Sequence, residues 1–235
     1  MTGGQQDVYG RGERPDLAPF VPPGARTVLD VGCASGGFAR TLRGVLGEGV
    51  RIVGVEAVPA AARRARAELD DVIEGFFPTA LEGRVERYDL ICFNDVLEHM
   101  VDPWDALALA HQWLSPSGTV LASIPNVQYG PHLQAVLAGR WEYTDTGILD
   151  RTHLRFFTRA SMLAMFAHAG YAVERCTGIN SAWSKEWRGV IRGSACPVAA
   201  LARRTAYAAV RRPLIGLRPD LEWQQFVIVA RPAGS

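Results

Sequence analysis

Lysine is almost missing from this sequence: the chain has 25 lysine and arginine residues, and Lys185 is the only lysine among them. An excess of one sign of charge is missing as well, because 24 aspartates and glutamates leave a formal net charge of +1. A chain whose net charge is this close to zero has no general attraction to polyanions. The composition, which also lacks a recognisable RNA-binding module, therefore argues against nucleic acid as a partner.

Cysteines and long apolar runs are also scarce. The four cysteines, Cys33, Cys92, Cys176 and Cys196, lack the paired spacing of a zinc site or a disulfide framework. No apolar stretch reaches the roughly 20 residues of a membrane-spanning helix, and no apolar segment of a signal peptide follows Met1. These absences predict a cytoplasmic protein with reduced thiols, and an apolar content of 48% is enough for a hydrophobic core.

The sequence does contain a buried strand that leads through a turn of small residues into a helix. Residues 28–31 are apolar except for Asp30, residues 32–37 form the turn, and Phe38 begins a helical period. Such a turn presents backbone N–H groups and a helix N-terminus to a ligand. This stretch is therefore the predicted ligand site.

Charge separates the two classes of ligand that use a turn of this kind. A dinucleotide carries a doubly negative pyrophosphate, which Asp30 at the strand tip would repel and Ala34 would keep away from the backbone. S-adenosylmethionine carries an ammonium and a sulfonium group that Asp30 attracts, and a carboxylate that the helix N-terminus after Gly36 attracts. Glu56, at the end of the next expected strand, offers two oxygens to the ribose hydroxyls. The charges favour S-adenosylmethionine over NAD.

Strands and helices alternate as far as residue 126, which predicts an α/β fold with a doubly wound parallel sheet. In such a sheet, ligands bind at the carboxyl ends of the strands. Five apolar runs are the expected parallel strands: residues 28–31, 51–56, 71–75, 88–93 and 119–124.

Four blocks in this order resemble the class I S-adenosylmethionine-dependent methyltransferases: residues 29–36, 54–56, 94–99 and 123–126. The resemblance implies a Rossmann-like sheet of seven strands that closes with residues 171–176 and a late antiparallel strand at residues 223–230. It also implies which residues hold the cofactor: Asp30, Gly32, Ala34, Gly36, Phe38, Glu56, Phe76 and Asn94. Relatives place an acid where Phe76 stands, so an aromatic wall takes the place of the usual adenine contact.

The segment between the fifth strand and residue 158 mixes aromatic and charged side chains without periodicity, as acceptor-binding loops do. Two blocks in it, residues 139–143 and 153–158, resemble methyltransferases of glycan and cell-envelope biosynthesis. The resemblance implies O-methylation of a hydroxyl on a saccharide or a saccharide-linked small molecule, and the predicted acceptor contacts are Tyr129, Trp141, Tyr143 and Arg155. An alternative interpretation is that this segment packs against a second subunit of a homodimer.

Transfer to a hydroxyl needs a group that takes its proton, and histidine is matched to neutral pH. We assign catalysis to His153, as the general base, and to Asp95 at the fourth strand tip. If residues 95–99 are helical, Asp95, Glu98 and His99 share one face at positions i, i+3 and i+4. With His153, these three side chains form an alternative site for Mg²⁺ or Mn²⁺, which would polarise the hydroxyl.

The expected domain organisation is a lead-in over residues 1–23, either without fixed structure or folded as a lid over the cofactor, followed by one methyltransferase domain over residues 24–235. Residues 183–220 form an insert, in which eight basic residues stand against one acid between Lys185 and Arg218. Such an insert suits peripheral contact with an anionic membrane, a grip on a phosphorylated acceptor or a solvated flap. Two other functions stay open: a metal-dependent RNA 2′-O-methyltransferase, and a regulatory protein that binds S-adenosylmethionine without turnover.

Overall fold

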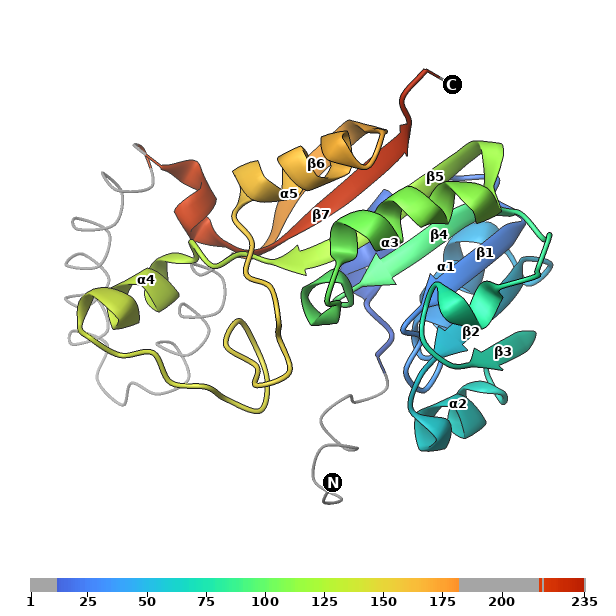
Figure 1. Cartoon of the computed structure of the whole chain (residues 1–235), viewed down its shortest axis with the longest axis horizontal. Coiled ribbons are helices and arrows are strands. Elements are labelled where there is room, and N and C mark those ends of the chain that lie inside the picture. The colour runs from blue at the N-terminus through green and yellow to red at the C-terminus, as the bar shows by residue number, and fades with distance from the viewer. Residues whose placement is uncertain (1–11, 182–215, 217, 235) are drawn as a thin grey trace, which may run out of the picture.

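The computed structural model describes residues 12–181, 216 and 218–234 (Figure 1). The basic insert predicted for residues 183–220, with the membrane contact proposed for it, lies almost wholly outside the described residues. The first part of the predicted lead-in lies outside them too. Within the described ranges, no helix is both long and apolar enough to cross a membrane.

A sheet of seven strands runs through the molecule in the order β3-β2-β1-β4-β5-β7-β6. Its members, in chain order, are β1 (Thr27–Val31), β2 (Arg51–Glu56), β3 (Asp71–Glu74), β4 (Tyr88–Asn94), β5 (Leu114–Pro125), β6 (Tyr171–Ser181) and β7 (Trp223–Pro232). Strand β7 runs antiparallel to both of its neighbours, β5 and β6. The predicted seven-stranded, doubly wound sheet with a late antiparallel strand is confirmed.

Helices cover both faces of the sheet, with α3 and α5 on one face and α1 on the other (Figure 1). The α-helices are α1 (Phe38–Leu46), α2 (Pro59–Ala65), α3 (Pro103–Ala110), α4 (Gly130–Leu137) and α5 (Arg159–His168), and the short 3-10 helices are η1 (Pro15–Phe20), η2 (Thr79–Leu81), η3 (Leu97–His99), η4 (His111–Trp113) and η5 (Pro219–Glu222). Leu29 and Val31 pack in the core with α3 and α5, whereas Val28 packs in the core with α1 and α2. This is the period-two alternation of a strand that is buried on both faces.

Two helices begin at caps that their sequences provide. At α3, Asp102 accepts a hydrogen bond from Asp105 N at 2.9 Å, and Pro103 takes the first helical position. At α5, Thr158 Oγ1 accepts a hydrogen bond from Ser161 N at 3.2 Å, and Ser161 Oγ accepts one from Thr158 N at 2.9 Å. A cap is worth about 1 kcal/mol. The cap of α5 also fixes the end of the segment predicted to bind the acceptor, residues 126–158, which is called the acceptor segment below.

The prediction of an unstructured lead-in is wrong for residues 15–21, which fold against the sheet. Leu17 is completely buried, and Phe20 and Val21 are exposed by only 7% and 5%. This segment contains η1, which packs on α1 and β7. Each buried side chain of this kind contributes about 1.5–3 kcal/mol, so the segment is part of the folded domain.

Candidate active site

The turn after β1 has a left-handed backbone at Gly32 (φ 69°), Ala34 (φ 49°) and Gly36 (φ 82°). At two of these positions a side chain would also collide with its surroundings. A Cβ on Gly32 would lie 2.5 Å from Val96 Cγ2, and one on Gly36 would lie 2.9 Å from Glu68 Cβ. Glycine therefore lets the turn approach its neighbours closely, with the N-terminus of α1 at the carboxyl end of the sheet.

Two carboxylates stand at neighbouring strand ends beside this turn, as predicted. Asp30, one residue before the end of β1, is 3% exposed, and Glu56, the last residue of β2, is 8% exposed. Burial, followed by the charge of Glu56, raises the pKa of Asp30 to about 7. The backbone holds Glu56 in place: Oε2 accepts a hydrogen bond from Ala34 N at 2.9 Å and Oε1 accepts one from Val58 N at 2.7 Å. Each oxygen keeps a lone pair for a ligand hydroxyl.

We expect Glu56→Ala to lower the affinity for S-adenosylmethionine at least about tenfold, because two bonds to a charged acceptor are lost, each worth about 1.5–3 kcal/mol. Titration calorimetry measures this change. Glu74→Ala is the matched control, since Glu74 ends the next strand with a side chain that is 42% exposed and pairs with Arg66. Equal affinities of the two variants, or wild-type binding of NAD as tight as that of S-adenosylmethionine, would contradict the assignment.

The other predicted cofactor residues differ in what they offer a ligand. Asn94 ends β4, and neither polar atom of its buried amide has a hydrogen-bond partner within the described part of the chain. Phe76 is 76% exposed after β3, so its ring has a free face for an adenine. Phe38 is 4% exposed and packs in the core. Phe38 can therefore meet a ligand only through its backbone.

Asp95 is engaged with partners on several other segments. The residue follows β4 with a left-handed backbone (φ 54°). Its carboxylate pairs with Arg14 of the N-terminal segment, and it accepts hydrogen bonds from Gln225 Nε2 at 2.7 Å and Ser123 Oγ at 3.3 Å. Asp95 therefore joins the N-terminal segment, β5 and β7 at the strand ends.

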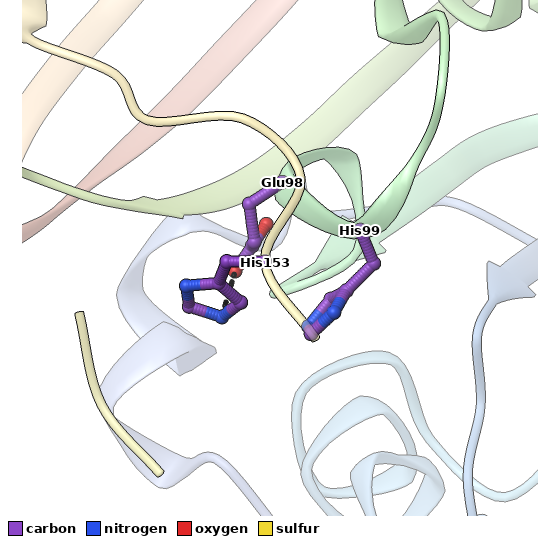
Figure 2. Close-up of side chains that lie close together, drawn as sticks. All are labelled: Glu98, His99 and His153. Atoms are coloured by element: carbon purple, nitrogen blue, oxygen red, sulfur yellow. Dashed lines mark ion pairs between the residues drawn. The ribbon is translucent and has the colours of Figure 1, made fainter. Parts of the chain in front are cut away.

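The helix assumed for residues 95–99 is wrong in its first part. η3 begins only at Leu97, so Asp95 does not share a helical face with Glu98 and His99. Among the residues that the structure describes, Glu98, His99 and His153 are brought together instead, with ligand atoms that all lie within 4.8 Å of one another. Figure 2 shows the three side chains converging, two of them from η3 and one from the acceptor segment. The predicted set of four metal ligands is thus reduced to three.

Glu98 is the buried member of this cluster. It is 1% exposed, and neither carboxyl oxygen has a hydrogen-bond partner among the described residues. His153 Nε2 lies 3.9 Å from Glu98 Oε1. Burial, followed by the negative charge of Asp95, raises the pKa of Glu98 well above its ordinary value. An unpaired buried carboxyl is costly, and a cation between Glu98 and the imidazoles would satisfy it.

Both imidazoles are oriented by backbone carbonyls of the acceptor segment. His99 Nδ1 lies 3.2 Å from Thr152 O, and His153 Nδ1 lies 3.0 Å from Ile148 O. A carbonyl only accepts, so Nδ1 is the donor in each ring and the neutral ring keeps its lone pair on Nε2. Burial, followed by the nearby His153, lowers the pKa of His99 and favours that neutral form. Ligating histidines are commonly oriented in this way.

Two of the predicted acceptor residues present their rings to solvent. Trp141 is 44% exposed and Tyr143 is 49% exposed. Trp141 is steadied by edge-on packing against Phe156, with ring centroids 5.5 Å apart. Tyr129 immediately precedes α4 as its N-cap residue. An exposed ring that is held at its edge offers a surface on which an acceptor can stack.

Arg155, the remaining predicted acceptor contact, is bonded to the backbone. Its guanidinium donates to the backbone carbonyls of Val101 and Leu154, and so it fastens the acceptor segment beside η3. Three residues that the sequence analysis did not include among the site residues, Arg14, Asp150 and Thr152, also contribute to the surroundings of the site. The Asp-x-Thr pattern at residues 150–152 is a local turn signal that could have been recognised.

Comparisons with known proteins point to one family of enzymes. A family model described as a methyltransferase domain matches residues 11–175. A ubiquinone biosynthesis O-methyltransferase of Hydrogenovibrio crunogenus is 27% identical over 158 residues, a match that covers 66% of this chain and 66% of that protein. The matched region thus spans just under two thirds of that relative's own length.

Solved structures share the fold. A SAM-dependent methyltransferase from Archaeoglobus fulgidus superposes with a TM-score of 0.67 at 16% identity, covering 96% of each chain. A SAM-dependent methyltransferase from Thiobacillus denitrificans, in complex with S-adenosyl-L-homocysteine, has a TM-score of 0.55 at 18% identity and covers 97% of this chain and 96% of its own.

Proposed function

We propose that this chain, which belongs to the family of class I S-adenosylmethionine-dependent methyltransferases, methylates a hydroxyl of a small molecule beside a divalent cation held by Glu98, His99 and His153. The family assignment makes the protein an enzyme with S-adenosylmethionine as its cofactor. The finer proposal depends on one observation. A buried carboxylate and two oriented imidazoles meet where β4 ends, at the edge of the sheet where ligands of this fold bind.

The cofactor would lie along the strand ends, where it supplies a methyl group from its sulfonium. Glu56 holds the ribose hydroxyls with its two remaining lone pairs, and Asp30 attracts the positive charges of the methionine part. The turn around Gly36 presents backbone N–H groups to the carboxylate. Asn94 and Phe76 complete the site with an unpaired amide and an exposed ring.

The donor atoms of the cluster suit a divalent cation. Glu98 offers two oxygens without hydrogen bonds, and each histidine offers an Nε2 lone pair. A divalent cation would supply Lewis-acid polarisation, which lowers the pKa of an acceptor hydroxyl. Because two ligands are nitrogens, they favour Mn²⁺ over the harder, oxygen-preferring Mg²⁺.

His153 as a general base without a cation is the alternative, and the geometry supports it less well. A general base must reach the hydroxyl proton of the acceptor. The Nε2 atom of His153 lies 3.9 Å from Glu98 Oε1, and the side chain is only 6% exposed. The imidazole therefore faces a carboxylate inside the protein, as a ligand of a shared cation would.

Two kinds of hydroxyl acceptor are supported by separate observations. The exposed rings of Trp141 and Tyr143 suit a saccharide or a saccharide-linked small molecule. The relative from Hydrogenovibrio crunogenus carries the name of an O-methyltransferase of ubiquinone biosynthesis, which supports an acceptor from that route. Both acceptors present a hydroxyl to the same cluster.

The test is release of S-adenosylhomocysteine from the full chain with a panel of acceptors, in the presence of Mn²⁺ and then of EDTA. The panel contains saccharides, hydroxylated intermediates of ubiquinone biosynthesis and a short RNA with free 2′-hydroxyls. We expect turnover with a small hydroxyl acceptor, loss of turnover with EDTA and recovery with Mn²⁺. Turnover with RNA alone would favour the RNA 2′-O-methyltransferase, and binding of the cofactor without turnover of any acceptor would favour a regulatory protein.

A further inference from the structure

We propose that Asp150 and Thr152 are positioning residues, which fix the ring orientation and the tautomer of His99 so that its Nε2 faces the cation site. This inference rests on the proposed function, because it concerns residues that would orient the ligands of the cation. It also gives a role to the buried acid of the acceptor segment, whose side chain accepts hydrogen bonds from Thr152.

A series of hydrogen bonds leads from Asp150 through Thr152 to His99. It begins at the carboxylate of Asp150, which is 8% exposed. A single oxygen, Oδ1, accepts two hydrogen bonds from Thr152, one from N at 2.8 Å and one from Oγ1 at 2.6 Å. A carboxylate accepts and does not donate. The hydroxyl hydrogen of Thr152 is therefore committed to Asp150, which leaves Oγ1 with lone pairs for another donor.

That donor is His99. Its Nδ1 lies 3.1 Å from Thr152 Oγ1 and 3.2 Å from Thr152 O. Both oxygens act as acceptors, so Nδ1 must carry the hydrogen and Nε2 must carry the lone pair. Without the commitment of the hydroxyl to Asp150, Thr152 Oγ1 could donate to Nδ1 instead, and the opposite tautomer would become accessible.

The same turn presents the second imidazole. His153 N donates to the backbone carbonyl of Asp150 at 3.0 Å, which closes the turn. Leu154 N and Arg155 N both donate to Glu98 O, at 2.8 and 3.0 Å. Residues 150–155 are thus fastened to η3 on both sides of His153, and Asp150 acts on His99 through its side chain and on His153 through its backbone.

Two readouts on the full chain test this inference. The first is the tautomer of His99 in the metal-free protein, from long-range ¹H–¹⁵N spectra of its imidazole; the chain has five histidines, and loss of one signal in His99→Gln assigns the resonance. The second is the affinity for Mn²⁺, measured by electron paramagnetic resonance. The variants are Asp150→Ala, which removes the acceptor, and Thr152→Val, which removes the hydroxyl while keeping the shape and the backbone carbonyl.

We expect both variants to weaken Mn²⁺ binding by about 10- to 100-fold, the usual effect of losing a group that orients a ligand. Asp150→Ala should also change His99 from a single Nδ1–H tautomer to a mixture, because the freed hydroxyl of Thr152 can then donate to Nδ1, whereas Thr152→Val, which has no hydroxyl and keeps the backbone carbonyl, should keep the Nδ1–H tautomer. Asp150→Asn and Thr152→Ser should restore both readouts, since one oxygen of Asp150 accepts both bonds and serine keeps the hydroxyl. Asp145→Ala is the matched control, because Asp145 lies on the same segment with a side chain that is 71% exposed and pairs with Arg151.

The inference fails if His99 keeps one tautomer in Asp150→Ala, or if Thr152→Val binds Mn²⁺ as tightly as the wild type does. It also fails if Asp145→Ala weakens Mn²⁺ binding as much as they do, because the effect would then belong to the segment as a whole. If the wild type does not bind Mn²⁺ but Asp150→Ala shows the tautomer change, the proposed cation is refuted and the positioning role is upheld. The two proposals can therefore fail separately.

Discussion

Alanine in place of His153 is expected to lower kcat by about 10²- to 10⁴-fold, the contribution of a group that helps to remove a proton from the acceptor. The substitution removes an imidazole that is 6% exposed and lies 3.9 Å from Glu98. Affinity for S-adenosylmethionine, measured by calorimetry, should be unchanged, because the proposed cofactor contacts, Asp30 and Glu56, lie on β1 and β2. His168→Ala is the control, since His168 is exposed on α5.

A chelator distinguishes the two possible roles of His153, which are ligand of a cation and general base without a cation. If the cluster holds a cation, EDTA inactivates the wild type and added Mn²⁺ restores it. Glu98→Gln, which keeps the volume of the side chain but removes its charge, should then lose activity together with His153→Ala. Activity that survives EDTA and Glu98→Gln would assign the proton transfer to His153 alone. Near-normal turnover by His153→Ala would contradict both roles.

The parallel part of the sheet could be predicted from the sequence because its strands are buried on both faces. Such strands appear as continuous apolar runs, and the run at residues 51–56 coincides with β2 residue for residue. The polar residues at or next to the ends of these runs, Asp30, Glu56 and Asn94, come to the same edge of the sheet because the strands are parallel. The candidate cofactor site could therefore be predicted from short local patterns in the sequence.

The N-terminal segment was mispredicted because its contacts are distant in the sequence. Leu17 and Phe20 stand three residues apart among prolines and charged residues, which is a weak helical signal. Their burial depends on η1 packing against α1 and β7. Arg14 pairs with Asp95, which is 81 positions away in the sequence. No local sequence pattern indicates such a pair.

The cluster of Glu98, His99 and His153 was predicted in part from the sequence. The i, i+3, i+4 rule assumes a helix from residue 95, but the left-handed backbone of Asp95 delays η3 until Leu97. A left-handed conformation at a residue other than glycine cannot be read from composition. Glu98 and His99 remain together because they are adjacent, and His153 joins them because the turn at Asp150 brings the acceptor segment back to η3.

Asparagine in place of Asp30 is expected to stabilise the ligand-free protein at pH 8 by up to about 4 kcal/mol, since each pKa unit is worth about 1.36 kcal/mol. The pKa of Asp30 is about 7 in the folded protein and 3.8 ordinarily, because the side chain is buried and lies near Glu56. A raised pKa means that folding favours the protonated carboxyl. This contribution to stability is complete below pH 3.8 and is lost as the pH rises to about 7.

Denaturant unfolding between pH 4 and pH 8 measures this effect. The free energy of unfolding of the wild type should fall over that range by more than that of Asp30→Asn, which has no carboxyl to titrate at this position. Asp71→Asn is the control, because Asp71 lies on β3 with a side chain that is 42% exposed and lies near Arg84. Equal pH dependence in wild type and Asp30→Asn would show that Asp30 titrates normally.

Binding of the cofactor should reverse the preference of the folded protein for a protonated Asp30, because the ammonium and sulfonium groups of the cofactor favour the ionised carboxylate. With a pKa of about 7, about one tenth of Asp30 is ionised at pH 6 and about nine tenths at pH 8, so wild-type affinity for S-adenosylmethionine should fall about tenfold between pH 8 and pH 6. Calorimetry in buffers of different ionisation enthalpy should detect a proton released on binding at pH 6. Asp30→Asn should bind weakly at both pH values and release no proton from this position. A wild-type affinity that does not change with pH would mean that Asp30 is not the residue that meets the positive charges of the cofactor.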